Sequence, residues 1–483
     1  MIFSSSPFSR FRLVIFSFIT CGLLLLSVPA HTQESATTTA PAVTAPAMVS
    51  SVKALELNAG DTAWMIVATA LVLLMTPGLA FFYGGLVRSR NALNTLMMSL
   101  GAMAVLGLIW ALAGYSLSFS HGGAVNAFIG GGEFLGLASF TSPVAHMGAP
   151  TIPISVHSMF QAMFFIITPA LISGALVERV KFSSYLVFIA LWSLLVYCPI
   201  AHWTWGPGGW IANLGVMDFA GGMVVHTSAG FSALAASILL GRRTGYGQIP
   251  MSPHSMPLCL LGGSLLWVGW CGFNGGSALH ADALAGLATA NTILAACAAM
   301  FVWMMIDAFT RKSMTALGAI TGAVVGLVAV TPASGFVSPL GAIAVGAIAS
   351  AVCFLMVSLR SRGSVDDSLD VFAVHGIGGI CGTVLTGIFA TGTLKTSGLN
   401  SLALSGLAEG GTQVFLRQVG CGFIVAVFAF VMSFFLLKCV DAVMGLRVTP
   451  EAEFLGLDAS QHDEEAYAQD ESNSMPIEPS YAA

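Results

Sequence analysis

Eleven apolar segments restrict the fold of this chain more than any other feature of its sequence. The hydrocarbon core of a bilayer is ~30 Å thick, which about 20 helical residues cross, and inside it only helices and closed barrels satisfy every backbone polar group. Hydrophobic residues make up 56% of the chain and charged residues 8%, against roughly 25% charged residues in a soluble domain. We therefore predict an all-α polytopic membrane protein. Its eleven predicted helices cover residues 62–86, 94–119, 155–178, 183–203, 219–240, 257–275, 284–306, 315–331, 338–359, 371–392 and 416–440.

The Lys and Arg residues predict the orientation of these helices. Cytoplasmic loops of membrane proteins carry an excess of Lys and Arg. With the N-terminus outside, the inner loops hold twelve of these residues, and the outer side of the mature chain holds only Lys53, Lys395 and Arg417. We therefore expect the N-terminus outside and the C-terminus inside. The sequence has no basic patch of the kind that would indicate nucleic-acid binding.

The N-terminal 60 residues have the composition of a targeting segment followed by a linker. Two arginines precede an apolar run over residues 13–26, and a Val-Pro-Ala sequence ends at Ala30. These features predict a cleaved signal peptide over residues 1–30, with an uncleaved first helix as the alternative. Residues 31–60 are rich in Ala, Thr and Pro, and we expect a periplasmic linker there. The helical domain then covers residues 61–446.

Two segments in different halves of the chain carry nearly the same histidine motif. DFAGGMVVHTSAG covers Asp218 to Gly230 and DVFAVHGIGG covers Asp370 to Gly379, and each begins with an aspartate and contains a Val-His pair. A lone histidine on a helix is more often a hydrogen-bonded core residue, but ionisable groups in transmembrane segments are functional by default. Because the two segments run in opposite directions, we predict an inverted five-plus-five repeat with one extra helix and a site between the halves.

Both imidazoles are expected near the middle of the membrane. His226 follows Asp218 by eight residues, which at ~1.5 Å per residue places it about 12 Å deeper, and His375 enters from the inner side. Two such histidines could instead ligate haem or zinc. Each of the two helices has one histidine, however, and the nine cysteines lie in apolar runs without a CxxC pair. We therefore expect no metal and no cofactor.

Five stretches that lie in order between residues 60 and 460 carry a more specific signal. They are MTPGLAFFYGGLVR (Met75 to Arg88), GALVERVKFS (Gly174 to Ser183), DFAGGMVVH (Asp218 to His226), WCGFNGGSA (Trp270 to Ala278) and DVFAVHGIGG (Asp370 to Gly379). Together they resemble the signatures of the ammonium transporter family, the Amt/Mep/Rhesus group. The resemblance implies a homotrimer of eleven-helix protomers in the bacterial inner membrane, with one conduction path per protomer, and a transporter rather than an enzyme.

The resemblance also implies roles for individual residues. Without it, the tryptophan would be an interfacial anchor, the phenylalanines packing residues, and the serine a side chain bonded to its own backbone. With it, three residues bind ammonium at the outer mouth, two form a stacked gate below, and two line the bore. They are Phe164, Trp205 and Ser277 for binding, Phe164 and Phe273 for the gate, and His226 and His375 for the bore.

Asp218 has two possible roles. It could be the base that deprotonates ammonium, but an aspartate at a helix N-terminus is also a good cap. We favour a structural and electrostatic role at the outer vestibule.

The expected function is transmembrane ammonium transport. Ammonium is bound at the outer aromatic and serine site and loses a proton, and ammonia crosses the twin-histidine bore together with the separated proton. An ammonium sensor with little transport and an electroneutral ammonia channel are alternatives, and a carbon dioxide or water channel is a weaker one.

The C-terminal tail, residues 447–483, is acidic. Nine Asp and Glu residues follow Arg447, and neither Lys nor Arg does, which indicates a solvated, partly disordered cytoplasmic tail. The tail also resembles the cytoplasmic tail of the family, which implies coupling between protomers and docking of a PII-type nitrogen regulatory protein. Asp463 departs from the family pattern, because a glycine is usual there.

Overall fold

The computed structural model describes residues 57–467 except 139, 142–144 and 147. The predicted signal peptide, nearly all of the predicted linker and the last residues of the tail therefore lie outside the described residues. The first helix begins at Ala59, two residues before the predicted start of the helical domain.

All eleven predicted apolar segments are helical, and four of them contain a π-helical turn. Ten are long and apolar enough to cross a membrane, and the eleventh, α12, has 15 residues. In the described part of the chain the segments are α2 (Ala59–Leu86), α3-η2-α4 (Ala92–Ile109, Trp110–Gly114, Tyr115–Phe119), α5 (Ile154–Leu176), α6-η5-α7 (Phe182–Trp192, Ser193–Tyr197, Cys198–Trp205), η6-α9 (Gly222–Thr227, Ser228–Leu240), α10 (Met256–Gly276), α11 (Ala283–Arg311), α12 (Ala316–Val330), α13 (Pro339–Ser361), η7-α14 (Phe372–Ile377, Gly378–Phe389) and α16 (Thr412–Met444).

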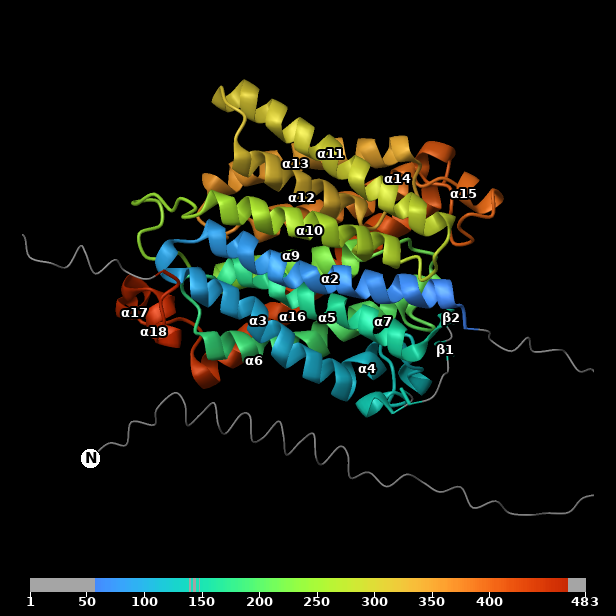
Figure 1. Ribbon diagram of the computed structural model, residues 1–483, viewed down its shortest axis with the longest axis horizontal. Helices are drawn as coiled ribbons and strands as arrows, with labels where there is room; N and C mark the ends of the chain where they lie inside the picture. Colours follow the sequence, from blue (N-terminus) through green and yellow to red (C-terminus); the bar gives the residue numbers. More distant parts are fainter. Residues whose placement is uncertain (1–56, 139, 142–144, 147, 468–483) are drawn as a thin grey trace, which may run out of the picture. The chain divides into compact units, whose positions relative to one another are not determined.

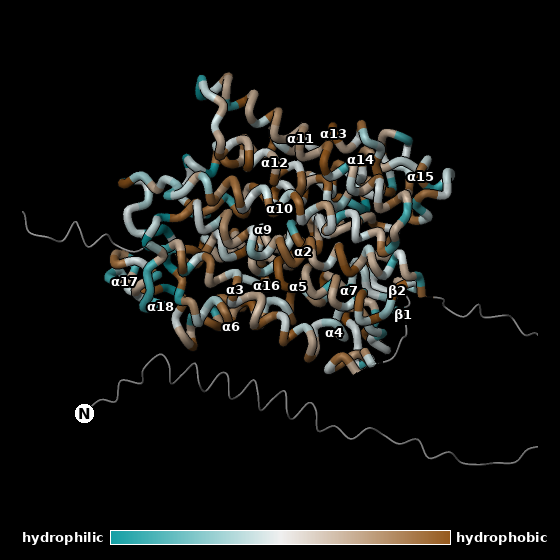
Figure 2. Tube along the Cα trace, viewed as in Figure 1, coloured by the Kyte–Doolittle hydropathy of each residue, from teal (hydrophilic) through white to brown (hydrophobic). Residues whose placement is uncertain are grey.

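Short elements lie at the two ends of the helices. Figure 1 shows α17 and α18 at one end of the view, and β1, β2 and α15 at the other. Hydrophilic residues gather around α17 and α18, while the long helices are largely hydrophobic (Figure 2). The short elements are β1 (Ala145–His146) paired antiparallel with β2 (Ala149–Pro153), α8 (Trp210–Asn213), α15 (Thr393–Thr396), α17 (Pro450–Leu455), α18 (Leu457–His462), and the single turns η1 (Ser89–Asn91), η3 (Gly123–Val125), η4 (Leu135–Leu137) and η8 (Leu407–Glu409).

The described part of the tail packs on the helical body, so the prediction of a solvated, partly disordered tail is wrong for residues 447–462. Glu453 and Asp458 are 1% and 2% exposed. The Glu453 carboxylate accepts a hydrogen bond from Thr244 N–H at 2.6 Å, and Asp458 accepts two from the first turn of α3. A carboxylate at a helix N-terminus satisfies free N–H groups and complements the helix dipole. These bonds hold α17 and α18 in place.

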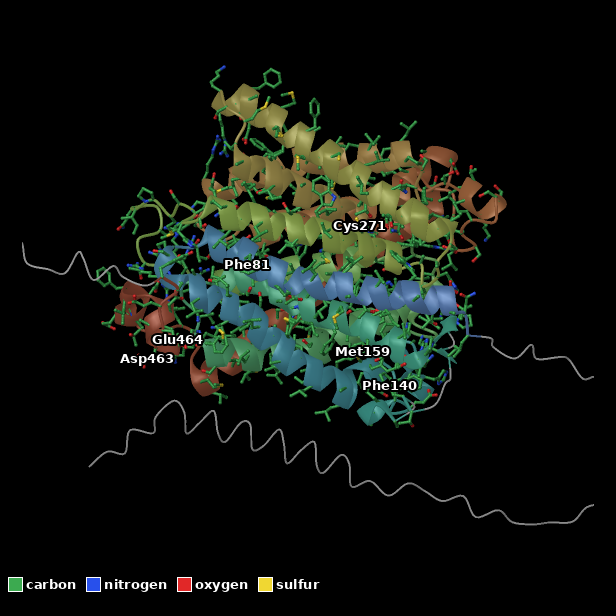
Figure 3. All side chains as sticks on the ribbon, in the orientation of Figure 1. Phe81, Phe140, Met159, Cys271, Asp463 and Glu464 are labelled. Carbon is green, nitrogen blue, oxygen red and sulfur yellow. The ribbon has the colours of Figure 1, made fainter. Side chains whose placement is uncertain are left out.

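Asp463 ends α18 in a left-handed conformation, with φ of 56°, and lies at the tail end of the molecule (Figure 3). Glycine adopts this conformation without steric penalty, whereas a residue with a Cβ adopts it at a cost. The backbone therefore explains why glycine is suited to this position, where the sequence departs from the family pattern.

Candidate functional site

A narrow bore, reduced to a small cavity, lies between two wide vestibules. One vestibule, of about 670 Å³, is lined by Asp218, Phe164 and Ser277 among others; we call it the Asp218 vestibule. The other, of about 740 Å³, is lined by Asp370, Arg243 and His375 among others; we call it the Asp370 vestibule. The cavity between them measures about 10 Å³, which is about the room that one water molecule needs.

The structure brings His226 and His375 together in this bore. Their Nδ1 atoms are 3.3 Å apart and their ring centroids 5.3 Å apart, and the two side chains are 1% and 4% exposed. A neutral imidazole has one donor and one acceptor nitrogen, so one Nδ1 donates its hydrogen to the other. The Nε2 of His226 is buried without a hydrogen-bond partner among the described residues, and His226 lines the bore.

Glycines allow the two histidine helices to cross at close range. A Cβ on Gly230 would lie 2.0 Å from the backbone nitrogen of Gly376, and a Cβ on Gly379 would lie 2.7 Å from that of Thr227. Any larger side chain at these positions would push the helices apart. The turn η6 follows Asp218, which lines one vestibule, and η7 follows Asp370, which lines the other, so the histidines reach this crossing from opposite sides.

A series of aromatic rings closes the bore toward the Asp218 vestibule. The ring centroids of Trp205 and Phe164 are 6.0 Å apart, those of Phe164 and Phe273 are 4.2 Å apart, and those of Phe273 and His226 are 6.1 Å apart. Phe164 and Phe273 are each 1% exposed. The two predicted gate residues therefore pack against each other, with their ring planes tilted by 36°, between the vestibule and the histidines.

Two hydrogen bonds orient the remaining predicted binding residues. The Trp205 indole N–H donates to the Asp218 carbonyl oxygen at 2.9 Å, which holds the ring against Phe164. The Ser277 hydroxyl donates to the Phe273 carbonyl at 2.8 Å. Because its hydrogen is engaged in the helix, the Ser277 oxygen offers only lone pairs to the vestibule. That arrangement suits a cation that donates hydrogen bonds.

The Asp218 carboxylate is saturated by backbone donors. Its two oxygens accept hydrogen bonds from four consecutive N–H groups, at 2.9, 2.6, 2.8 and 3.2 Å. Gly221, with φ of 119°, turns the chain so that these groups point at one carboxylate. Asp218 thus caps η6, in agreement with the structural role favoured from the sequence. The donors are the N–H groups of Gly221, Gly222, Met223 and Val224.

The aspartate equivalent to Asp218 is Asp367, so its pairing with Asp370 by motif is wrong. Asp367 precedes His375 by eight residues, as Asp218 precedes His226, and it accepts a hydrogen bond from Phe372 N–H at 2.7 Å. Asp370 instead forms an ion pair with Arg360. The prediction paired the two aspartates because the stretches DFA and DVF are similar. The spacing of eight residues to the histidine, which is the same in both segments, would have identified Asp367.

A buried ion-pair network beside the Asp370 vestibule was not predicted. Arg243 pairs with Glu178 and with Asp366, each at 2.9 Å, and both carboxylates are buried. Burial alone would raise the pKa of Glu178, but Arg243 and Arg88 outweigh it and hold that pKa below its usual value. The pKa of Asp366 is likewise lowered by Arg243, against the effect of burial. The cluster of charged residues directly after α5 is unusual in a chain with so few charges. It was the sequence signal that could have indicated this ion-pair network.

Comparison with known proteins places this geometry in a family. Residues 63–467 match the model of the Ammonium Transporter Family. The chain is 45% identical to an ammonium transporter of Bacillus subtilis, over 84% of this chain and 98% of that protein. It is 43% identical to ammonium transporter Amt1 of Archaeoglobus fulgidus, over 84% and 99%.

Solved structures agree with these sequence matches. The crystal structure of Saccharomyces cerevisiae Mep2 superposes with a TM-score of 0.76 at 35% identity, covering 82% of this chain and 89% of that one. A structure described as a sensor Amt protein superposes with a TM-score of 0.75 at 29% identity, covering 83% and 98%. This chain belongs to the ammonium transporter family.

Proposed function

We propose that this ammonium transporter separates ammonium into ammonia and a proton and conducts both through the histidine bore. The observation that carries the proposal is the hydrogen-bonded imidazole pair in a narrow bore between two wide vestibules. Moving a bare ion of this size into a medium of low dielectric has an idealised cost of order 20 kcal/mol. Ammonia is neutral and avoids that cost. Potassium has no proton to lose and is therefore excluded.

Binding precedes deprotonation in the Asp218 vestibule. The faces of Trp205 and Phe164 attract a cation, with cation-π contacts of about 0.5–2 kcal/mol each, and the Ser277 oxygen accepts one of its N–H groups. Opening of the Phe164–Phe273 stack then admits the nitrogen to the bore. Asp218 stabilises the η6 N-terminus and adds negative charge at this mouth.

The proton follows the imidazole pair. The N–H bond of ammonium breaks and His226 Nε2, which has no partner among the described residues, takes the proton. His226 passes its Nδ1 hydrogen to His375 Nδ1, and His375 releases its other hydrogen into the Asp370 vestibule, which it lines. Ammonia leaves on the same side and is protonated there, so the net movement is that of ammonium.

The cellular setting belongs to the same proposal. The twelve-to-three distribution of Lys and Arg favours a bacterial inner membrane orientation with the Asp218 vestibule periplasmic and the C-terminus cytoplasmic. Residues 1–30 act as a signal peptide and residues 31–60 as a periplasmic linker. Three protomers form a homotrimer, and the tail is the docking surface for a PII-type regulator.

The test is the transient current that an ammonium pulse evokes in liposomes containing purified protein. The wild type should give a current that potassium does not give. The His226→Ala, His375→Ala double variant should lose this preference, because water can then carry ions through the bore. Phe309→Ala, on the exposed surface of α11, serves as the control and should behave as the wild type.

Each other outcome changes the proposal. Internal alkalinisation without a current would leave an electroneutral ammonia channel. Neither alkalinisation nor current, with ammonium still bound, would indicate a sensor. A wild-type current that the double variant carries with unchanged preference would remove the histidine pair from the mechanism.

A further inference from the structure

An apolar groove runs along the exposed surface of α16. It measures about 390 Å³, and its side chains are well exposed, with Phe423 at 65% and Val431 at 55%. On a membrane-spanning helix, an exposed apolar surface of this kind contacts lipid or another protein. The groove therefore suits an occupant with a long apolar part. Its lining residues are Phe423, Ile424, Val427, Phe428, Val431 and Met432.

The charges of α16 give the depth of this groove in the membrane. Arg417 and Lys438 lie on either side of residues 418–437, a segment of 20 residues without a charge. At ~1.5 Å per residue this segment spans about 30 Å, the thickness of the hydrocarbon core. The groove begins at Phe423, about 9 Å below Arg417, and extends to just past the middle of the core. An acyl chain of the leaflet next to Arg417 occupies this depth.

Arg417 is an exposed cation at the level of that leaflet's headgroups. Its Nη1 donates to the Leu214 carbonyl oxygen at 2.9 Å, and the next residue, Gln418, bonds to the backbone of Met217, so this is the Asp218 side of the molecule. Arg417 forms no ion pair with the residues that the structure describes. A guanidinium has five N–H donors, and two of them can bind one phosphate side by side.

One face of α16 connects Arg417 to the groove. Ile424 and Val431 follow Arg417 by 7 and 14 residues, and at 3.6 residues per turn all three side chains leave the helix in nearly the same direction. Gly420 lies between Arg417 and the groove on this face. It is exposed, and a Cβ there would meet nothing within 4 Å. A ligand held by Arg417 can therefore enter the groove directly along the helix backbone.

We propose that this face of α16 binds an anionic phospholipid of the leaflet on the Asp218 side, with its phosphate at Arg417 and one acyl chain in the groove. A zwitterionic phospholipid also has a phosphate, but its cationic headgroup offsets the attraction to Arg417. The same charge disfavours a second protein protomer on this face, because α16 of that protomer would present an identical arginine. The site lies outside the bore, so the inference does not depend on the transport mechanism.

Native mass spectrometry of the protein purified in detergent tests the proposal. Phosphatidylglycerol and phosphatidylcholine with identical acyl chains are added separately, and the affinity of the first lipid retained per protomer is measured. The wild type should bind phosphatidylglycerol about tenfold more tightly, as expected for hydrogen bonds to a charged group. Arg417→Gln should weaken phosphatidylglycerol about tenfold and phosphatidylcholine by less than about threefold. Lys395→Gln is the control, because Lys395 is exposed on the same side, and the wild-type preference should remain.

A second variant tests the path from the arginine to the groove. Gly420→Leu places a side chain where the acyl chain enters, so both lipids should bind more weakly, by about fourfold for each methylene that loses its contact. Gly286→Leu on α11 is the matched control, because Gly286 is also exposed with nothing within 4 Å of its Cβ position. Both lipids should bind to that variant as they bind to the wild type.

Three results would overturn the inference. The first is equal affinity of the wild type for the two lipids, and the second is an unchanged preference in Arg417→Gln. The third is a loss of oligomer mass in Arg417→Gln or Gly420→Leu with unchanged lipid affinities, which would assign this face of α16 to a contact between protomers. Transport measurements are not needed for any of these results, so failure of the inference leaves the proposed function standing.

Discussion

The two ends of the bore share one sequence pattern, an aspartate before a pore histidine, but the two aspartates form different hydrogen bonds. Asp218 and Asp367 each precede a pore histidine by eight residues and a π-helical turn by a few residues. Asp218 accepts four backbone hydrogen bonds. Asp367 accepts a hydrogen bond from Phe372 N–H through Oδ2, and its Oδ1 has no partner among the described residues.

The difference follows from what surrounds each carboxylate. At the Asp218 end, four backbone N–H groups stabilise the charge. At the other end, Asp370 and Arg360 lie close by, and burial together with the Asp370 charge raises the pKa of Asp367 to about 6. Its neighbour Asp366, which pairs with Arg243, has a lowered pKa. One end is therefore organised by backbone geometry and the other by charged side chains.

Removing the central cation of the charged end should have the largest effect. Arg243→Met leaves Glu178 and Asp366 buried with reduced compensation, and breaking a buried pair by removing one partner typically destabilises by about 3–5 kcal/mol. The melting temperature of the purified protein in detergent should fall clearly. Arg242→Met is the matched control, because that side chain is exposed and the protein should melt as the wild type does. Equal melting of all three proteins would contradict the charge-based account of this end.

The backbone-organised end should respond strongly to Asp218→Asn. An asparagine has one acceptor oxygen, so at least one of the four buried N–H groups loses its partner, which destabilises by about 2–4 kcal/mol. Thermal unfolding in detergent measures this loss. Asp282→Asn is the control: Asp282 caps α11 through Ala285 N–H, and asparagine caps a helix equally well. A similar, small loss in both variants would mean that the four bonds do not set the stability of η6.

Asp367→Asn should have an effect that depends on pH. Because the folded-state pKa of Asp367, about 6, lies above its usual 3.8, its stabilising contribution is complete below about pH 3.8 and is lost as the pH rises through 6. The difference in unfolding free energy between variant and wild type should therefore shift in favour of the variant from pH 4 to pH 7, by at most about 3 kcal/mol. Melting temperatures at both pH values measure the shift, and a difference that is constant with pH would refute it.

The smallest effect is expected in the tail at the charged end. Asp463→Gly removes a side chain from a left-handed position and should stabilise the end of α18 by about 1 kcal/mol. Protection of α18 amides from hydrogen exchange should increase. Glu464→Gly, at the next position, is the control and should not increase protection. A decrease in Asp463→Gly would show that the aspartate contributes a contact that outweighs its backbone penalty.

Much of this architecture could be predicted from the sequence. All eleven apolar segments are helical, and the two histidines meet as the paired motifs indicated. Phe164, Trp205 and Ser277 line one vestibule, and Phe273 packs against Phe164 below it, which agrees with their predicted positions. Apolar length and residue spacing along a helix are local properties, so the sequence displays them directly.

Other features depend on which side chains meet across the fold. Asp218 and Asp370 look alike in sequence, yet Asp367 takes the equivalent position because its carboxylate, and not that of Asp370, accepts from the N–H of the first residue of η7. The ion pairs of Arg243 join residues more than 60 positions apart, and the docked tail places Asp458 at α3 across most of the chain.

The sequence by itself therefore determined the helical membrane class, the apolar segments and the paired histidines, because hydrophobicity and spacing act locally. Only the tertiary structure decided which aspartate is saturated by backbone donors and which charges pair. These properties depend on the distance and direction between groups on different helices, and packing alone determines both.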